Sequence, residues 1–181
     1  MAIYIGFNSP NTLYGLHFKG MVSLGHGSEV RIGFTVRATG FKEGAATLSD
    51  DEGKVLFTGW RSWNLAIFSR KQDDTIAVSC QKYDIYGDAT AGKTMSADIQ
   101  NIPDGTDVCV FTYDEPFSNK GTIMNALLML GATRAKLNAL PFRGSYILIG
   151  RKGMAAGQGK EYQVNAGGIQ TKIVFVNGVM Q

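Results

Sequence analysis

Alternating apolar and polar residues predict strands in the first third of the chain. Residues Val30–Val36 place an apolar side chain at every second position, which is typical of a strand with one buried face. Shorter segments predict further strands at Ile3–Phe7, Leu13–Phe18 and Val55–Thr58. The pattern therefore predicts a β-rich region over residues 1–58.

Beyond residue 59 the apolar segments become less regular. Val108–Tyr113 is apolar almost throughout, as expected of a central strand that is covered on both faces. Leu65–Phe68 and Ser145–Gly150 predict two more buried strands, and Ile76–Tyr86 predicts a fourth. The sequence thus predicts four strands in this part of the chain.

Two segments between these strands carry the period of an α-helix. Met95, Ile99 and Ile102 fall at i, i+4 and i+7, and Pro103 ends that helix. A second helix is predicted over Ser118–Gly131, with a polar cap at its start and a glycine at its end. Residues 60–153 then have the order β-β-α-β-α-β. This order predicts the fold class α/β (α+β), with some parallel strand pairing.

The last part of the chain returns to a strand pattern. Tyr162–Val164 and Lys172–Val176 predict strands, and Asn177-Gly178 is typical of a type I′ turn. We therefore divide the chain into three parts: a β-rich N-terminal region at 1–58, a central domain at 59–155 and a C-terminal β extension at 156–181.

Composition limits the class of protein. Of the 181 residues, 44% are hydrophobic and 18% are charged, which suffices for a core and disfavours long disorder. The net charge of +3 is too small an excess to indicate nucleic-acid binding. No apolar run approaches the roughly 18 residues of a membrane-spanning helix, and no secretory signal is visible. We expect a protein made in the cytosol, with no nucleic-acid partner and no membrane insertion.

The sequence contains no motif that is typical of a metal site or a nucleotide site. Cys80 and Cys109 form no CxxC pair, and we expect two buried thiols. His17 and His26 have no nearby cysteine or acidic pair, so a zinc site of the usual spacing cannot be built. Gly150–Gly153 (GRKG) follows a strand and lacks the spacing of a phosphate-binding loop. We expect no metal and no cofactor, and we interpret Arg151-Lys152 within it as the solvated end of a strand.

Two groups of residues are candidates for ligand binding. Trp60–Trp63 (WRSW) combines tryptophans, on which sugars can stack, with an arginine that can donate to hydroxyl groups. The alternative is that one tryptophan fills the core and the other covers an edge. Asp114 directly follows a buried strand, at the edge where ligands bind in open α/β sheets. No nucleophile motif accompanies these residues, so we do not expect an enzyme.

Four motifs occur in order between Trp60 and Gly153. They are Arg61 with Asn64, Ile102–Thr106 (IPDGT) before a strand ending in Asp114, Leu130–Ala132 (LGA), and Phe142–Tyr146 (FRGSY) followed by Lys152-Gly153. In this order and spacing they resemble the interleukin-like EMT inducer/PANDER family, also called the GG domain. The resemblance covers about half of the chain. The sequence departs from the family pattern at Gly144, where an aspartate is usual, so one acceptor for a sugar hydroxyl is lost.

The resemblance implies a compact GG-type, β-sandwich-like domain flanked by helices and without catalytic machinery. Such domains occur in secreted vertebrate signalling proteins, in a sugar-binding module of a glycosyltransferase and in bacteriophage tail fibres. The secreted forms carry a signal peptide and disulfide cysteines, so the phage setting fits this sequence better. Sugar-binding members use arginines and an aspartate at motif positions that correspond here to Arg61, Asp114 and Arg143.

We therefore expect a non-enzymatic structural protein of a bacteriophage tail, in a fibre, baseplate or collar. It would be made in the bacterial cytoplasm and assembled into the virion as a homo- or hetero-oligomer with other tail proteins. The alternative is a carbohydrate-binding module for host-surface glycans, with Arg61, Trp63, Asp114 and Arg143 lining the site. Both interpretations hold if the protein is a receptor-binding tip.

Overall fold

The computed structural model describes the backbone of residues 14–18 and the whole of residues 29–181. The predicted strand Ile3–Phe7 and the side chains of both histidines lie outside the described residues. The strands are β1 (Tyr14–Phe18), β2 (Arg31–Gly40), β3 (Thr47–Asp50), β4 (Val55–Thr58), β5 (Ser62–Arg70), β6 (Ile76–Tyr83), β7 (Asp107–Asp114), β8 (Ser145–Arg151), β9 (Lys160–Val164), β10 (Gly168–Val176) and β11 (Val179–Met180). The helices are α1 (Ala89–Asn101), α2 (Met124–Leu128) and α3 (Arg134–Ala139), with a 3-10 turn, η1, at Lys120–Thr122.

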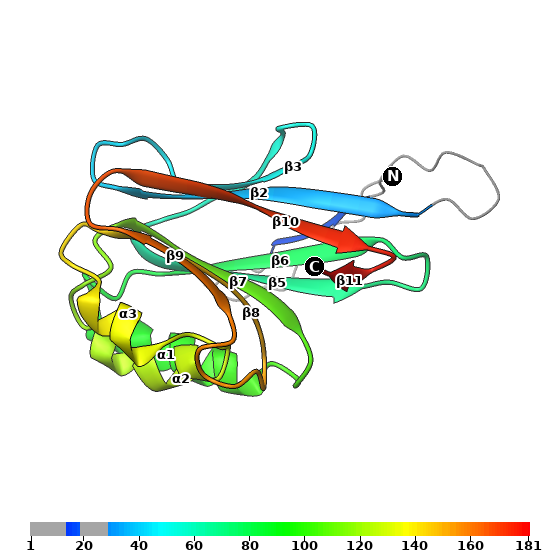
Figure 1. The fold of residues 1–181 in the computed structure, drawn as a ribbon. Helices are drawn as coiled ribbons and strands as arrows, with labels where there is room; N and C mark the ends of the chain where they lie inside the picture. The colour runs from blue at the N-terminus through cyan, green and yellow to red at the C-terminus, as the bar shows by residue number, and fades with distance from the viewer. Residues whose placement is uncertain (1–13, 19–28) are drawn as a thin grey trace.

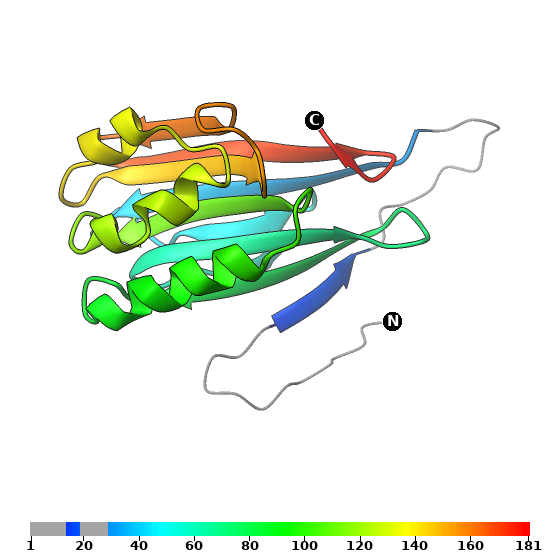
Figure 2. The same ribbon diagram turned by 90° about the horizontal axis from the view of Figure 1, so that it is seen from below.

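These elements form three layers, two of strands and one of helices (Figure 1). One sheet has the strand order β1-β6-β5-β7-β8-β9, and the other has the order β4-β3-β2-β10-β11. The three helices cover the face of the first sheet that points away from the second sheet (Figure 2). The expected β-sandwich-like fold with flanking helices is therefore confirmed.

Parallel pairing is much rarer than the β-α-β order predicts. Among the described strands, the parallel pair is β2 with β7, joined at Thr39–Tyr113 and Gly40–Asp114. This short pairing links the two sheets. Helix α1 does connect two strands of the same direction, β6 and β7, but β5 lies between them and is antiparallel to both. The α/β expectation is therefore too loose, and the fold is mainly β with helices on one side.

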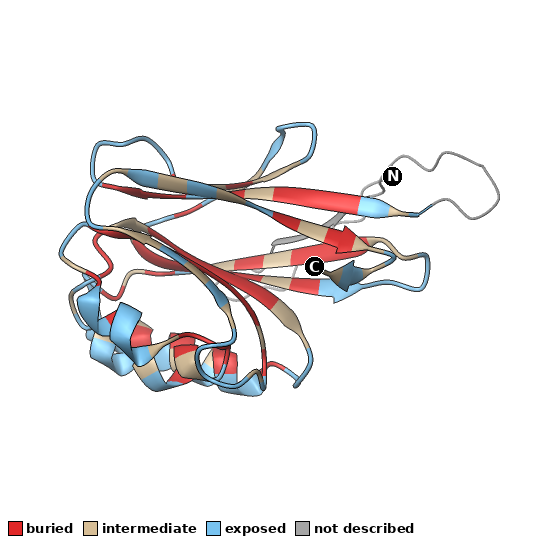
Figure 3. Ribbon diagram, viewed as in Figure 1, coloured by how far each residue is buried: buried red, intermediate tan, exposed pale blue. Residues whose placement is uncertain are grey.

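Successive side chains of the central strands point into two different hydrophobic cores. In β7, Val108 and Val110 face the helices, whereas Cys109 and Phe111 face the second sheet. Strand β8 repeats the arrangement, and the central strands are buried along most of their length (Figure 3). The prediction that Val108–Tyr113 is covered on both faces is confirmed. The strand needs apolar side chains on both faces because neither face meets water.

The core between the sheets is built from distant parts of the sequence. Phe34 of β2, Phe68 of β5 and Phe175 of β10 pack together, with ring centroids 5.3 to 6.0 Å apart. Cys80 and Cys109 lie in the same core as free thiols, as expected. Burial raises the pKa of the Cys80 thiol to about 12.

The helical segment after β7 differs from the prediction. The expected continuous helix over Ser118–Gly131 is broken into η1 and the five-residue α2. Asn119 adopts a left-handed conformation with φ 59°, and its side chain donates to the Ile85 carbonyl instead of capping a helix. Gly131, with φ 97°, does end α2, because the N–H of the next residue, Ala132, bonds the Leu127 carbonyl at 3.2 Å.

Most other predicted elements are found within a few residues of their expected bounds. The strand predicted at Ile76–Tyr86 ends three residues earlier, at Tyr83. Helix α3 has no counterpart in the prediction, although Thr133 caps it by accepting from the Lys136 N–H. Asn177 and Gly178 have φ values of 48° and 74°, which confirms the type I′ turn between β10 and β11.

Candidate functional site

Five exposed aromatic side chains lie on loops at one end of the sandwich. They are Phe41 after β2, Trp60 before β5, Tyr86 after β6, Phe117 after β7 and Phe142 before β8. The strand directions bring these loops to the same end, at the left of Figure 1. We call this end, with its five aromatic side chains, the aromatic loop end. Exposed aromatic rings on clustered loops are unfavourable in water and are enriched where proteins bind ligands.

Each of these rings has a cation close to it. The Arg143 guanidinium carbon lies 4.3 Å from the centre of the Phe41 ring and 5.1 Å from that of Phe142. Similar pairs join Arg61 to Tyr86 at 4.7 Å, Lys120 to Phe117 at 4.5 Å and Lys82 to Trp60 at 5.7 Å. Distances within about 6 Å are favourable cation–π contacts. These contacts favour the observed positions of the rings, which remain exposed.

Arg61 forms a two-bond ion pair with Asp84. Its Nε donates to Oδ1 at 2.9 Å and its Nη2 donates to Oδ2 at 2.6 Å. The hydrogen bonds to this carboxylate raise the pKa of Arg61, and the charge of Asp114 acts in the same direction. A planar, bidentate pair of this kind fixes the guanidinium.

Arg143 and Asp114 form a looser pair beside it. The Arg143 Nε lies 3.8 Å from Asp114 Oδ1, and the Arg143 side chain is 48% exposed. Both residues have left-handed backbone conformations, with φ values of 57° and 61°. Such a conformation costs an L-residue about 1–2 kcal/mol and persists only where the surrounding structure holds it. The Arg143 carbonyl oxygen packs against Gly40, where an added Cβ would lie only 2.7 Å away.

The structure brings three of the four expected site residues to this end. Arg61, Asp114 and Arg143 lie at the surface, where two carboxylates and two guanidinium groups alternate along the end of the sheet. Trp63 is a correction, because its side chain is fully buried in the core under the helices. Its Nε1 donates to the Pro116 carbonyl at 3.0 Å. From this position its indole ring has no face to offer to a sugar.

Trp60 belonged to the candidate group WRSW, but Trp63 was chosen from it for the site, and Asp84 and Tyr86 were missed. The alternation in β5 carried a signal, since Trp63 shares the helix-facing side with Leu65, and that pattern assigns it to the core. Asp84 and Tyr86 were missed because the strand predicted at Ile76–Tyr86 included them, whereas they lie in the loop after β6. Phe41 and Phe142 have no local signal, because their contact with Arg143 depends on the pairing of distant strands.

A model of the interleukin-like EMT inducer family matches residues 61–154. The match covers slightly more than half of the chain. This chain belongs to the interleukin-like EMT inducer family. Comparison with curated proteins finds no match for it.

Two motifs of this interleukin-like EMT inducer chain support the loops of the site. Asn64 is fully buried, and its Oδ1 accepts from the Trp60 N–H at 2.8 Å while its Nδ2 donates to the Trp60 carbonyl at 3.0 Å. Asn64 therefore fixes the loop that carries Trp60 and Arg61. In the FRGSY motif, the Pro141 ring lies 2.8 Å from the place of a Cβ on Gly144. An aspartate at this position would need Pro141 to move.

Two other family motifs meet at the opposite end of the molecule. The Gly105 N–H of the IPDGT motif donates to the Lys152 carbonyl at 2.9 Å, and the Lys152 N–H donates to the Thr106 carbonyl at 2.9 Å. The Lys152 side chain is only 7% exposed, and its ammonium group bonds Asp104 Oδ1 at 3.0 Å. Arg151 pairs with Asp107 at 2.6 Å. The interpretation of Arg151-Lys152 as a solvated strand end is therefore wrong for Lys152, which is buried, whereas Arg151 ends β8 with a side chain that is 40% exposed.

Within the described part of the chain, no group of His, Cys, Asp and Glu residues is arranged to hold a metal ion. None of the described helices is long and apolar enough to cross a bilayer. The aromatic loop end offers guanidinium donors, carboxylate acceptors and flat apolar rings. Its chemistry suits the reversible binding of a polar molecule that has apolar faces.

The stability of this family member should depend on pH through Asp84. Burial alone would raise the pKa of this carboxyl, but hydrogen bonds from Arg61 and the Gly87 N–H hold it below its ordinary value. The ionised form therefore stabilises the fold above about pH 4 and loses this effect as pH falls through the folded-state pKa. We expect the Tm of the wild type to exceed that of Asp84→Asn at pH 6. The difference should shrink toward pH 3, and a difference that grows in acid would contradict the assignment.

Proposed function

We propose that this chain is a non-enzymatic carbohydrate-binding protein whose aromatic loop end contacts the glycan. The observation that carries the proposal is the set of five exposed rings on five loops, beside two arginine–aspartate pairs. Sugar rings have apolar C–H faces that pack on aromatic rings, and their hydroxyl groups bond guanidinium donors and carboxylate acceptors.

The loops are held in position before any ligand binds. Asn64 fixes the Trp60 loop, Asn119 bonds the loop after β6, and Trp63 anchors the loop after β7 through Pro116. A preformed site loses less conformational entropy on binding than a flexible one, which favours affinity from a small contact area. In this proposal the tryptophan that stacks on the sugar is Trp60, whereas the sequence suggested Trp63.

A glycan array with purified protein tests the proposal. The informative variants are Arg143→Ala and Trp60→Ala, and the matched controls are Arg31→Ala and Tyr162→Ala, which remove exposed side chains of similar chemistry outside the aromatic loop end. We expect the first two to weaken binding at least about tenfold. For Arg143 the reason is a hydrogen bond to a charged group, which contributes about 1.5–3 kcal/mol. For Trp60 it is the lost aromatic contact, since truncating a tryptophan at a binding site often costs about 2 kcal/mol or more.

The controls should bind glycans as the wild type does. The carbohydrate role is refuted if the wild type binds no glycan, or if Arg143→Ala and Trp60→Ala bind as well as the controls. Lost thermal stability in Arg143→Ala together with unchanged binding would assign Arg143 a scaffold role instead.

For the biological setting we propose the bacteriophage tail, with the protein in a fibre, baseplate or collar. This part rests on the resemblance of the motifs to tail-fibre domains. In that setting the aromatic loop end would contact host-surface glycans, and the partners would be other tail proteins in a homo- or hetero-oligomer. Mass spectrometry of purified virions tests it, because the protein should be present in stoichiometric amounts with known tail components. Its absence from virions would refute the setting while leaving the glycan proposal intact.

A further inference from the structure

A cleft of about 510 Å³ lies at the end of the sandwich opposite the aromatic loop end. It opens between the two sheets, near the β5–β6 and β10–β11 turns at the right of Figure 1. Its lining includes Phe68, Arg70, Asp107, Arg151, Phe175 and Val179. A volume of this size is within the usual range of small-molecule sites.

Strand register explains why this cleft has an apolar floor and a charged wall. Phe68, Asp107 and Arg151 lie opposite one another on β5, β7 and β8. Directly opposed residues of antiparallel strands point to the same face, which here is the face toward the second sheet. Phe68 and Phe175 close the core from the two sheets, with ring centroids 5.3 Å apart. Beyond them the same face of the sheet changes from apolar to charged.

Arg151 is held from one side only. Its Nε donates to Asp107 Oδ1 at 2.6 Å, whereas its two terminal nitrogens bond no described residue. The Asp107 side chain is 13% exposed and that of Arg151 is 40% exposed. The carboxylate thus fixes the guanidinium, and the terminal N–H groups remain available to a ligand.

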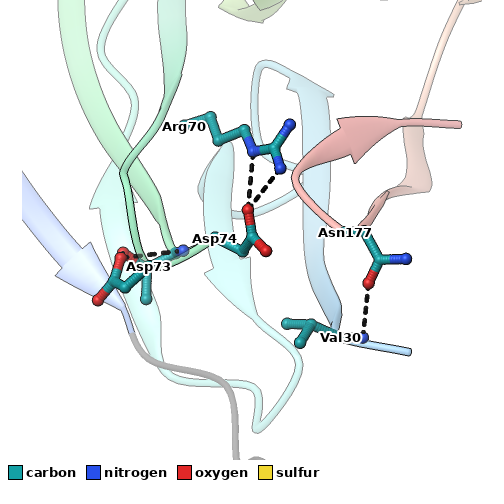
Figure 4. A network of polar contacts seen from close by, with 6 residues as sticks. Val30, Arg70, Asp73, Asp74 and Asn177 are labelled. Atoms are coloured by element: carbon teal, nitrogen blue, oxygen red, sulfur yellow. Dashed lines mark hydrogen bonds and ion pairs between the residues drawn. The ribbon is translucent and has the colours of Figure 1, made fainter. Parts of the chain in front are cut away.

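Arg70 is fixed in the same way at the end of β5, which is separated from β8 by β7. Its Nε and Nη2 both donate to Asp74 Oδ1, at 2.9 and 2.5 Å (Figure 4). Its stem packs on Gly178, where an added Cβ would lie 2.5 Å from the Arg70 Cδ. That turn is tied to the start of β2, because Val30 N–H donates to Asn177 Oδ1 at 3.0 Å (Figure 4). Arg70 Nη1 bonds no described residue, so it too can serve a ligand.

The geometry points to a second binding site in this cleft, for a small amphiphilic molecule with one negatively charged group. Its carboxylate, sulfonate or phosphate ester group would accept from the terminal nitrogens of Arg70 and Arg151. Its apolar part would cover the exposed side chain of Val179, above a floor that Phe68 and Phe175 form. The charges of the cleft are balanced in pairs, with Asp74 on Arg70 and Asp107 on Arg151, so the site suits a monoanion rather than a polyanion.

A fluorescence titration of the full chain with 8-anilinonaphthalene-1-sulfonate tests this site. This probe joins one sulfonate to aromatic rings, and its uncharged analogue N-phenyl-1-naphthylamine serves as the matched control ligand. We expect saturable 1:1 binding of the sulfonate, and binding of the analogue that is at least about tenfold weaker. Arg151→Gln and Arg70→Gln should each weaken sulfonate binding by a similar factor. Arg70 is in an exposed ion pair, so its variant should fold even if Arg151→Gln does not.

The control protein is Arg143→Gln, which alters the aromatic loop end and should bind the sulfonate as the wild type does. The proposal is overturned if no saturable binding occurs, if the uncharged analogue binds equally well, or if Arg70→Gln binds as tightly as the wild type. Loss of sulfonate binding in Arg143→Gln would place the probe at the aromatic loop end and would also overturn it. Because glycan binding is measured with different variants, the two sites can fail independently.

Discussion

Replacing Trp63 with alanine is expected to lower the free energy of unfolding by about 3–5 kcal/mol, the usual cost of removing a buried tryptophan. The side chain is fully buried, and its ring packs against Tyr146 with the centroids 5.8 Å apart. The substitution also leaves the Pro116 carbonyl without the indole donor that holds the loop after β7. Chemical denaturation, followed by circular dichroism, measures the effect.

Trp60→Ala is the matched control for this prediction. Trp60 is 57% exposed, so its removal should change the free energy of unfolding by less than about 1 kcal/mol. The two substitutions should therefore have different effects: Trp63→Ala lowers stability, whereas Trp60→Ala weakens glycan binding. Equal destabilisation by both substitutions would show that the burial of Trp63 is assigned wrongly.

The substitution Gly150→Ala should be of comparable severity, with a loss of about 3 kcal/mol, the upper end of the usual range for overpacking a core. A Cβ at this position would lie 1.9 Å from the Leu130 carbonyl oxygen, which belongs to the backbone of the turn that follows α2. A flexible side chain could move away, but here the strand and the turn must separate, which strains a close-packed core. Thermal and chemical denaturation of the purified variant test this.

Gly121→Ala provides the control, because a Cβ at Gly121 meets no atom within 4 Å. It should be neutral, or stabilising by a few tenths of a kcal/mol through the lower entropy of the unfolded chain. If Gly150→Ala proved as well tolerated as Gly121→Ala, the close approach of the Leu130 backbone to β8 would be incorrect.

The positions of most strands could be predicted because the pattern of apolar residues in each strand depends on which of its faces is buried. The alternation of β2 reports one buried face, and the apolar run of β7 reports two. The break in the helical segment after β7 could not be predicted. It occurs at Asn119, which has a left-handed conformation and bonds the carbonyl of Ile85, 34 residues away. Local propensity contains no information about such a partner.

The candidate site was predictable only in part, for a similar reason. Arg61, Asp114 and Arg143 were indicated by motifs that the family shares. The rings beside them were not indicated, since Phe41 meets Arg143 only because β2 crosses to the end of β7. Trp63 was misplaced because the cluster around Arg61 was weighed above the alternation of β5, in which Trp63 and Leu65 face the same core.

The pairing of β2 with β10 has a consequence for how the chain folds. These strands flank the family segment, and their ends join Val30 to Asn177 across 147 residues. Contacts between such distant residues form slowly, since a long loop must close before they contribute to stability. During synthesis, β2 is made early, but its partner β10 is made more than 120 residues later. Until then Phe68, Phe111 and Ile147 have an incomplete cover, and this nascent state is where a chaperone would be most useful.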